Sequence, residues 1–292
     1  MKSLVKKIRN KNIVNVIRVF NPEKSRLIVF FPGWLSTEIT WRYFLPELSK
    51  NFRIEYFESR EKPSAQPSNI GCHTEYHIEC QTFSAHGDDA ANYLNSLNEE
   101  EYYVIAASVG ASVFLSIIER LHQRPKGQVL ISPSISSPLL KVSGPLSILL
   151  STLQRSPSGL LYFLRPVFIA IIKRLAANKD AYQVTAAINS LAAANLSRVT
   201  ASARQLLNFE LDLAPISEVN VPTLIVTTTL DSAHHSQDAQ TLNACLPNSS
   251  ILSFSTFAHA RSSVCAQKIS NWINDMADVL SFLESALGEK AL

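Results

Sequence analysis

The sequence has few cysteines, and their spacing argues against both a disulfide framework and a metal site. Its 292 residues include four cysteines and no Cys-x-x-Cys pair: Cys72, Cys80, Cys245 and Cys265. Scattered cysteines are typical of a reducing compartment, so we expect a cytoplasmic protein. His73 and His77 lie between the first two, but no second half-site accompanies them. We therefore interpret this stretch as a polar loop and expect no metal.

Long apolar runs and strong charge patterns are also absent. The longest apolar stretch, Gly159–Ile172, is too short to span a bilayer and is interrupted by Arg165 and Pro166. No apolar core with a cleavage site follows the basic N-terminus, so we expect no signal peptide. The basic residues among the first twelve are interpreted as a solvated end. No Lys/Arg stripe with interleaved aromatics continues beyond them, which gives nucleic-acid binding little support.

The chain does contain an alternation of apolar strand patterns and helix patterns. A composition with 46% hydrophobic and 17% charged residues excludes disorder. Strands are predicted at Ile13–Phe20, Arg26–Phe31, Phe52–Phe57, Tyr102–Ala107, Gln128–Ser132, Thr223–Thr228 and Ser250–Phe254. The first two are separated by a turn at hairpin distance. Helix patterns between the later strands indicate an α/β protein with a mostly parallel sheet flanked by helices.

The alternation stops in the middle of the chain. Residues 134–214 show helix patterns and no convincing strand. We predict a core domain formed by residues 1–133 and 215–292, with residues 134–214 as a helical cap insertion. Stretches rich in large apolar residues within 146–172 favour an apolar pocket between cap and core, although they could equally serve only to pack the two together.

A candidate nucleophile lies where a predicted strand meets a predicted helix. The strand Tyr102–Ala107 runs directly into Ser108, and small residues, Ala106 and Gly110, lie two positions before and after the serine. A sharp strand–turn–helix elbow needs small residues there, because larger side chains would collide with the neighbouring strand and helix. Such a turn raises the serine hydroxyl above the edge of the sheet.

This segment resembles the nucleophile elbow of the α/β-hydrolase fold family, with alanine at the first small position. The resemblance implies a Ser–acid–His triad in that order along the chain. Asp231 follows the strand Thr223–Thr228, and His259 lies in a loop after the last strand. In open α/β sheets, ligands bind at the carboxyl ends of the strands, where both residues are expected. His234 and His235 follow the acid too closely to be its partner.

The resemblance also implies an oxyanion hole made by two backbone N–H groups. One is that of Val109, directly after the nucleophile, and the other is that of Trp34 in the loop after the strand Arg26–Phe31. Gly33 would permit close approach of substrate, and the Trp34 side chain would line the acyl side of the pocket. The loop departs from the family pattern at Pro32, where relatives carry a histidine that braces it.

A second departure follows the strand Phe52–Phe57. Many relatives carry Asp-x-Arg-Gly-x-Gly-x-Ser there, whereas residues 58–64 have an arginine, Arg60, and a nearby serine, Ser64, but neither glycine. This departure argues against assignment to any familiar subfamily.

The pattern as a whole predicts a serine hydrolase that cleaves an ester of an apolar small molecule through an acyl-enzyme, with no metal or organic cofactor. Thioesters, lipid esters and a carbon–carbon bond remain open as substrates. A different class also remains open, a non-catalytic hydrolase-fold binding protein, although none of the triad residues is missing. The oligomeric state does not follow from the sequence.

Overall fold

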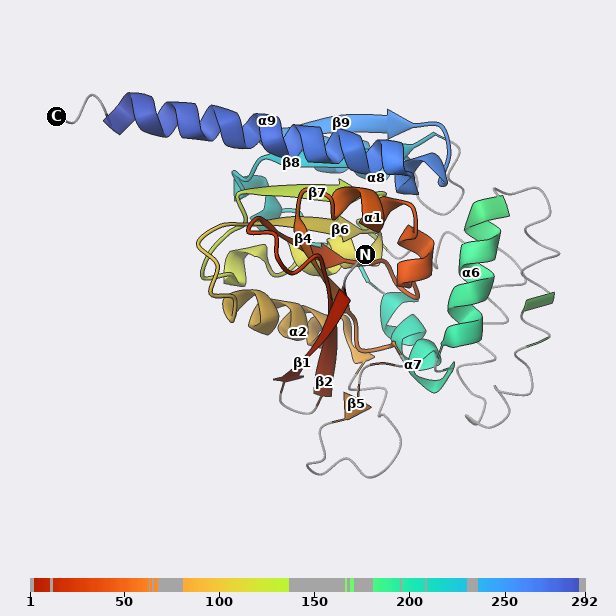
Figure 1. Ribbon diagram of the computed structural model, residues 1–292. Helices are drawn as coiled ribbons and strands as arrows, with labels where there is room; N and C mark the ends of the chain where they lie inside the picture. Colours follow the sequence, from red (N-terminus) through yellow and green to blue (C-terminus); the bar gives the residue numbers. More distant parts are fainter. Residues whose placement is uncertain are drawn as a thin grey trace.

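A nine-stranded sheet forms the centre of the molecule (Figure 1). The computed structural model describes residues 3–10, 13–62, 64, 66–67, 81–136, 166, 169–170, 181–194, 196–207, 209–229 and 236–288. The strand order is β1-β2-β4-β3-β6-β7-β8-β9, with β5 paired to β2. The strands are β1 (Ser3–Asn10), β2 (Ile13–Phe20), β3 (Leu27–Phe31), β4 (Arg53–Glu58), β5 (Gln66–Pro67), β6 (Tyr102–Ala107), β7 (Gly127–Ile131), β8 (Thr223–Thr228) and β9 (Ser249–Phe254).

Six neighbouring strands, from β4 to β9 in spatial order, are parallel. Their carboxyl ends therefore meet at one edge of the sheet, as the sequence predicted. The described helices and 3-10 turns are η1 (Glu38–Trp41), α1 (Phe44–Leu48), α2 (Phe83–Asn95), α3 (Val109–Leu115), η3 (Ile118–Arg120), α6 (Ala181–Ala193), α7 (Leu196–Leu207), η4 (Pro215–Glu218), α8 (Ser236–Cys245), η5 (His259–Arg261) and α9 (Ser263–Gly288). None of these helices combines the length and apolar character needed to cross a bilayer.

Both faces of the sheet are covered, which explains why its central strands are apolar throughout. Alternate residues of a strand point to opposite faces. Leu27, Val29 and Phe31 of β3 pack into the cluster that includes α2, α3 and α8. Ile28 and Phe30 pack into the cluster that includes α1 and α9. Burial of each such side chain stabilises the fold by about 1.5–3 kcal/mol.

The N-terminal part of the sheet differs from the prediction in two ways. The strands β2 and β3 are not a hairpin, because β4 lies between them and pairs with both. The basic end of the chain is a strand, β1, antiparallel to β2. The ammonium group of Lys6 on β1 lies 2.5 Å from the carboxylate of Glu55, which is buried on β4. Lys6 of β1 thus supplies a partner for a buried charge.

Two described helices from the middle of the chain, α6 and α7, lie beyond the carboxyl ends of the strands (Figure 1). Tyr182 of α6 donates a hydrogen bond to the carbonyl of Thr40, 2.7 Å away. Arg198 of α7 donates to the carbonyl of Lys62, 2.8 Å away. These contacts fix the two helices to the loops that follow β3 and β4. The apolar stretches within 146–172 lie largely outside the described residues, so the cap and its boundaries stay a prediction.

Helix α3 approaches the end of β3 closely, and this approach depends on Gly110. A methyl group at Gly110 would lie 2.6 Å from the carbonyl oxygen of Phe31 and 2.4 Å from that of Pro32. Both atoms belong to the backbone, so a side chain could be accommodated only by a shift of the helix or the strand end.

We therefore predict that Gly110→Ala destabilises the protein by about 1–3 kcal/mol, the usual effect of overpacking. Urea unfolding of the two proteins measures the difference. Gly87→Ala in α2 is the matched control, because the nearest atom to its new methyl group is a side-chain methyl of Ile117 at 3.0 Å, which can move. Equal stabilities of the Gly110 and Gly87 variants would contradict the close approach.

Candidate active site

Ser108 lies in the turn between β6 and α3 with a strained backbone. Its φ of 50° and ψ of −124° lie in a region that side chains other than glycine rarely occupy. Residues held in such regions cost of order 1–3 kcal/mol and cluster at functional sites. The Ser108 N–H donates to the carbonyl of Ile131 at the end of β7, 2.9 Å away. The turn therefore presents a partly exposed serine at the carboxyl edge of the sheet.

The residues predicted to form the oxyanion hole lie beside this serine. A methyl group built on Gly33 would be 3.1 Å from the Cβ atom of Ser108, so the glycine permits the loop after β3 to lie against the nucleophile. Val109 is the first residue of α3, and a first-turn N–H has no acceptor within its own helix. Among the described residues, no hydrogen bond occupies the backbone N–H of Trp34. Whether these two groups bind an oxyanion stays a prediction.

The loop after β3 has a brace of its own, in place of the missing histidine. Leu35 adopts a left-handed conformation with φ of 60°, and its N–H lies 3.4 Å from Oε1 of Glu61. The ammonium group of Lys62 lies 3.5 Å from the carbonyl oxygen of Gly33. The N–H of Ser36 closes the turn onto the same carbonyl, at 3.0 Å. Two adjacent side chains after β4 thus hold both ends of the loop.

The other two predicted triad residues lie after β8 and β9. His259 begins η5, and its exposed ring places Nδ1 2.8 Å from the Oγ of Ser255. Asp231, three positions after the end of β8, lies outside the described residues, which stop at Thr229 and resume at Ser236. Because β6, β8 and β9 are parallel, their carboxyl ends lie at the same edge of the sheet. The triad as a unit stays a prediction.

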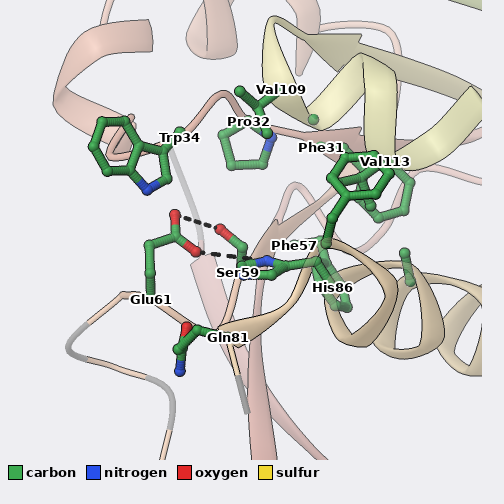
Figure 2. Close-up of a pocket in the computed structure, with 13 residues that line it drawn as sticks. Phe31, Pro32, Trp34, Phe57, Ser59, Glu61, Gln81, His86, Val109 and Val113 are labelled. Carbon is green, nitrogen blue, oxygen red and sulfur yellow. Dashed lines mark hydrogen bonds and ion pairs between the residues drawn. The ribbon is translucent and has the colours of Figure 1, made fainter. Parts of the chain in front are cut away.

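A pocket adjoins the elbow (Figure 2). Most of its wall is apolar and comes from β3, β4, α2 and α3: Phe31, Pro32, Trp34, Phe57, Phe83, Ala90, Val109, Gly110 and Val113. The indole of Trp34 donates to the Oγ of Ser202 on α7, 2.8 Å away, which ties this wall to the middle helices.

One side of the pocket is polar, and its residues were not predicted from the sequence. Ser59, Glu61, Gln81 and His86 line it together. The hydroxyl of Ser59 donates to Oε1 of Glu61 at 2.8 Å, and Nδ1 of His86 lies 3.8 Å from Oε2 (Figure 2). These residues come from separate segments, and only Glu61, where the family pattern has a glycine, signalled them in the sequence.

The electrostatics of this side favour an ionised carboxylate beside a neutral imidazole. Burial alone would raise the pKa of Glu61, but the Lys62 ammonium, 3.2 Å away, and the Ser59 hydroxyl lower it to about 2. Burial lowers the pKa of His86, and Arg60 adds to the effect, against the opposing pull of Glu61. Burial also lowers the pKa of Lys62, which Glu61 partly offsets.

The described part of the chain contains no group of three or more His, Cys, Asp or Glu side chains that could hold a metal. Cys245 and Cys265 are free thiols, and burial raises the pKa of Cys265 to about 12. The stretch from Cys72 to Cys80 lies outside the described residues. The expected cytoplasmic location stays a prediction.

Solved structures share this fold. An esterase from Exiguobacterium antarcticum matches with a TM-score of 0.70 at 12% identity, over 94% of this chain and 100% of its own. A hydrolase from Pseudomonas aeruginosa matches with a TM-score of 0.62 at 16% identity, over 96% and 98%. A haloalkane dehalogenase from Bradyrhizobium elkanii matches with a TM-score of 0.65 at 10% identity, over 96% and 99%. No protein-family model and no curated protein matches the sequence.

The chain therefore has the α/β-hydrolase fold, as the elbow around Ser108 predicted. Esterases and dehalogenases share the fold but use different chemistry, so the fold alone does not define the reaction.

The neutral His86 predicts a pH dependence of stability. Its pKa is lower in the folded chain than its ordinary value of 6.5. Below pH 6.5 the unfolded chain therefore takes up a proton that the folded chain does not, and stability falls until the pH passes the folded pKa. His86→Gln should reduce the loss of stability between pH 7.5 and 5, by at most about 1.4 kcal/mol per pH unit.

Urea unfolding at the two pH values measures this difference. His122→Gln, at an exposed position, controls for the loss of one histidine. If wild type and His86→Gln lose the same stability on acidification, His86 is not held neutral by burial.

Proposed function

We propose that this chain is a serine hydrolase that forms an acyl-enzyme on Ser108. The observation that carries the proposal is the strained serine between β6 and α3, packed against Gly33. Strain of this kind is retained where the surrounding structure requires it, and a serine hydroxyl raised above a sheet edge is the arrangement that acyl transfer uses. The hydrolases and esterases that share the fold support the proposal.

In the proposed reaction His259 takes the proton of the Ser108 hydroxyl as its oxygen attacks the substrate carbonyl. The N–H groups of Val109 and Trp34 stabilise the negative charge that develops on the carbonyl oxygen. Asp231 holds the histidine tautomer and stabilises the imidazolium, and His259 then protonates the leaving group. Water repeats the sequence on the acyl-enzyme and releases the acid.

Two other acids of the described chain that could be considered for this role are already engaged. Glu58, at the end of β4, is buried and pairs with Arg18 and with the hydroxyl of Ser64. Asp212 is exposed and accepts a hydrogen bond from the N–H of Ala214, 3.0 Å away. These contacts favour Asp231 as the acid of the triad.

The apolar wall of the pocket supports an apolar acyl substrate, with α6 and α7 as part of a lid. An ester is the substrate class that we propose. Thioesters, lipid esters and a carbon–carbon bond are the alternatives, and substrate panels distinguish them.

Ser108→Ala should leave a folded protein that a fluorophosphonate probe no longer labels. The probe reacts covalently only with an activated serine. Turnover should fall to the residual catalysis that binding and the oxyanion hole supply, roughly 10³–10⁴ over water. Probe labelling and hydrolysis of p-nitrophenyl esters measure both effects, with Ser84→Ala at an exposed position of α2 as the control. A wild type that the probe never labels would favour a non-catalytic binding protein instead.

Asp231→Asn should keep the fold and lower kcat by about 10⁴, because the histidine tautomer is no longer held. Steady-state kinetics on the same esters measure the loss, and circular dichroism confirms the fold. A loss of less than about tenfold would place the acid elsewhere, and the variants Ser255→Ala, Glu58→Gln and Asp212→Asn would then be compared.

A further inference from the structure

The polar side of the pocket contains buried atoms that lack partners. Gln81 is 1% exposed, and both its Nε2 and its Oε1 form no hydrogen bond with any residue that the structure describes. Glu61 is also 1% exposed, and its Oε2 likewise forms no hydrogen bond with any residue that the structure describes. Both residues line the pocket beside the elbow. Buried polar groups in native proteins are almost always paired, so three such atoms at one wall indicate a partner that enters the pocket.

The donors and acceptors that are unpaired at this wall indicate which chemical group could bind there. Oε1 of Glu61 is occupied by Ser59, Lys62 and the N–H of Leu35. Oε2 can therefore accept one further hydrogen bond, while the Gln81 amide can both donate and accept. A hydroxyl has one proton, so it can donate to Oε2 of Glu61 while it accepts from Nε2 of Gln81, which gives a partner to two of the three atoms.

The charges around Glu61 favour a neutral partner over a cation. The Lys62 ammonium lies 3.2 Å from Oε1 and offsets the carboxylate. Arg60 lies close by and pairs with the buried Asp89 of α2, 2.7 Å away. Nδ1 of His86 lies 3.8 Å from Oε2, and burial lowers the pKa of this imidazole. The wall has almost no net charge, so an ammonium group would lose its hydration without gaining an unpaired counter-ion.

We propose that Glu61 and Gln81 bind a hydroxyl group on the chain of the substrate that enters this pocket, so that the preferred substrates are hydroxyacyl esters. The apolar wall contacts the methylene chain, and the polar wall binds the hydroxyl. This inference rests on the proposed function, since it assigns the acyl group to the pocket beside Ser108.

The test compares p-nitrophenyl esters of ω-hydroxyhexanoate, ω-hydroxyoctanoate and ω-hydroxydecanoate with esters in which a methyl group replaces the hydroxyl. At the chain length that reaches the wall, wild type should prefer the hydroxylated ester by roughly 10- to 100-fold in kcat/KM, the usual effect of one hydrogen bond to a charged group. No preference at any length would overturn the proposal. An equal or greater preference for the ω-amino ester would overturn the assignment of a neutral partner.

Gln81→Met is the main variant, because it keeps the length of the side chain and removes both unpartnered atoms. It should lower the preference at least tenfold and raise the Tm of the substrate-free protein, since the unpaired polar atoms are gone. Gln267→Met, exposed on α9, should keep the wild-type preference and Tm. A Gln81→Met variant with the full wild-type preference would overturn the proposal. Glu61→Gln is the second variant, and it too should lower the preference.

A binding measurement separates this proposal from the proposed function. Calorimetry with ω-hydroxyoctanamide and nonanamide, which do not react, needs no catalysis. If the esters are not hydrolysed but the hydroxylated amide binds more tightly, the proposed function fails and the hydroxyl site stands. If the esters are hydrolysed and neither assay distinguishes the hydroxylated compound, the hydroxyl site fails and the serine mechanism stands.

Discussion

The close approach of α3 to the end of β3 is the constraint on which the candidate site depends. Gly110 allows the helix to lie against the carbonyls of Phe31 and Pro32, and Gly33 allows the following loop to lie against Ser108. The strained serine is held between these two contacts. Strain of a few kcal/mol is tolerable because both faces of the sheet are fully covered, so the strand end and the helix cannot relax independently.

A buried ion pair extends this constraint to the loop that follows β4. Glu61 holds the left-handed Leu35, and Lys62 holds the carbonyl of Gly33. Both charged side chains are nearly inaccessible, and breaking such a pair by removing one partner typically costs about 3–5 kcal/mol. The residues that depart from the α/β-hydrolase pattern thus replace the brace that Pro32 cannot supply, and in doing so they place a carboxylate in the wall of the pocket.

Much of the fold could be predicted from local patterns, because central strands that are covered on both faces appear in the sequence as continuous apolar runs. The parallel strands and the position of Ser108 at the end of one of them could be predicted in this way. Strand β1 could not, since its exposed, lysine-rich sequence is stabilised by pairing with β2 and by the ion pair of Lys6 with Glu55. The polar wall was missed because Gln81 and His86 are unremarkable in sequence, and only tertiary packing brings them beside Glu61.

The unpartnered atoms of this wall also bear on how the protein balances stability against function. An unpaired buried donor or acceptor costs about 1–3 kcal/mol, so a wall designed only for packing would carry apolar side chains. Gln81 therefore lowers the stability of the substrate-free protein, and a group that pairs with its amide, such as a substrate hydroxyl, would offset that cost. A site that discriminates by hydrogen bonding gains its specificity from this cost. A substrate without the hydroxyl excludes water from the polar atoms but leaves them unpaired, so it binds less tightly than the hydroxylated substrate. The same reasoning explains why the apolar residues of the pocket, which accept any methylene chain, cannot by themselves define the substrate.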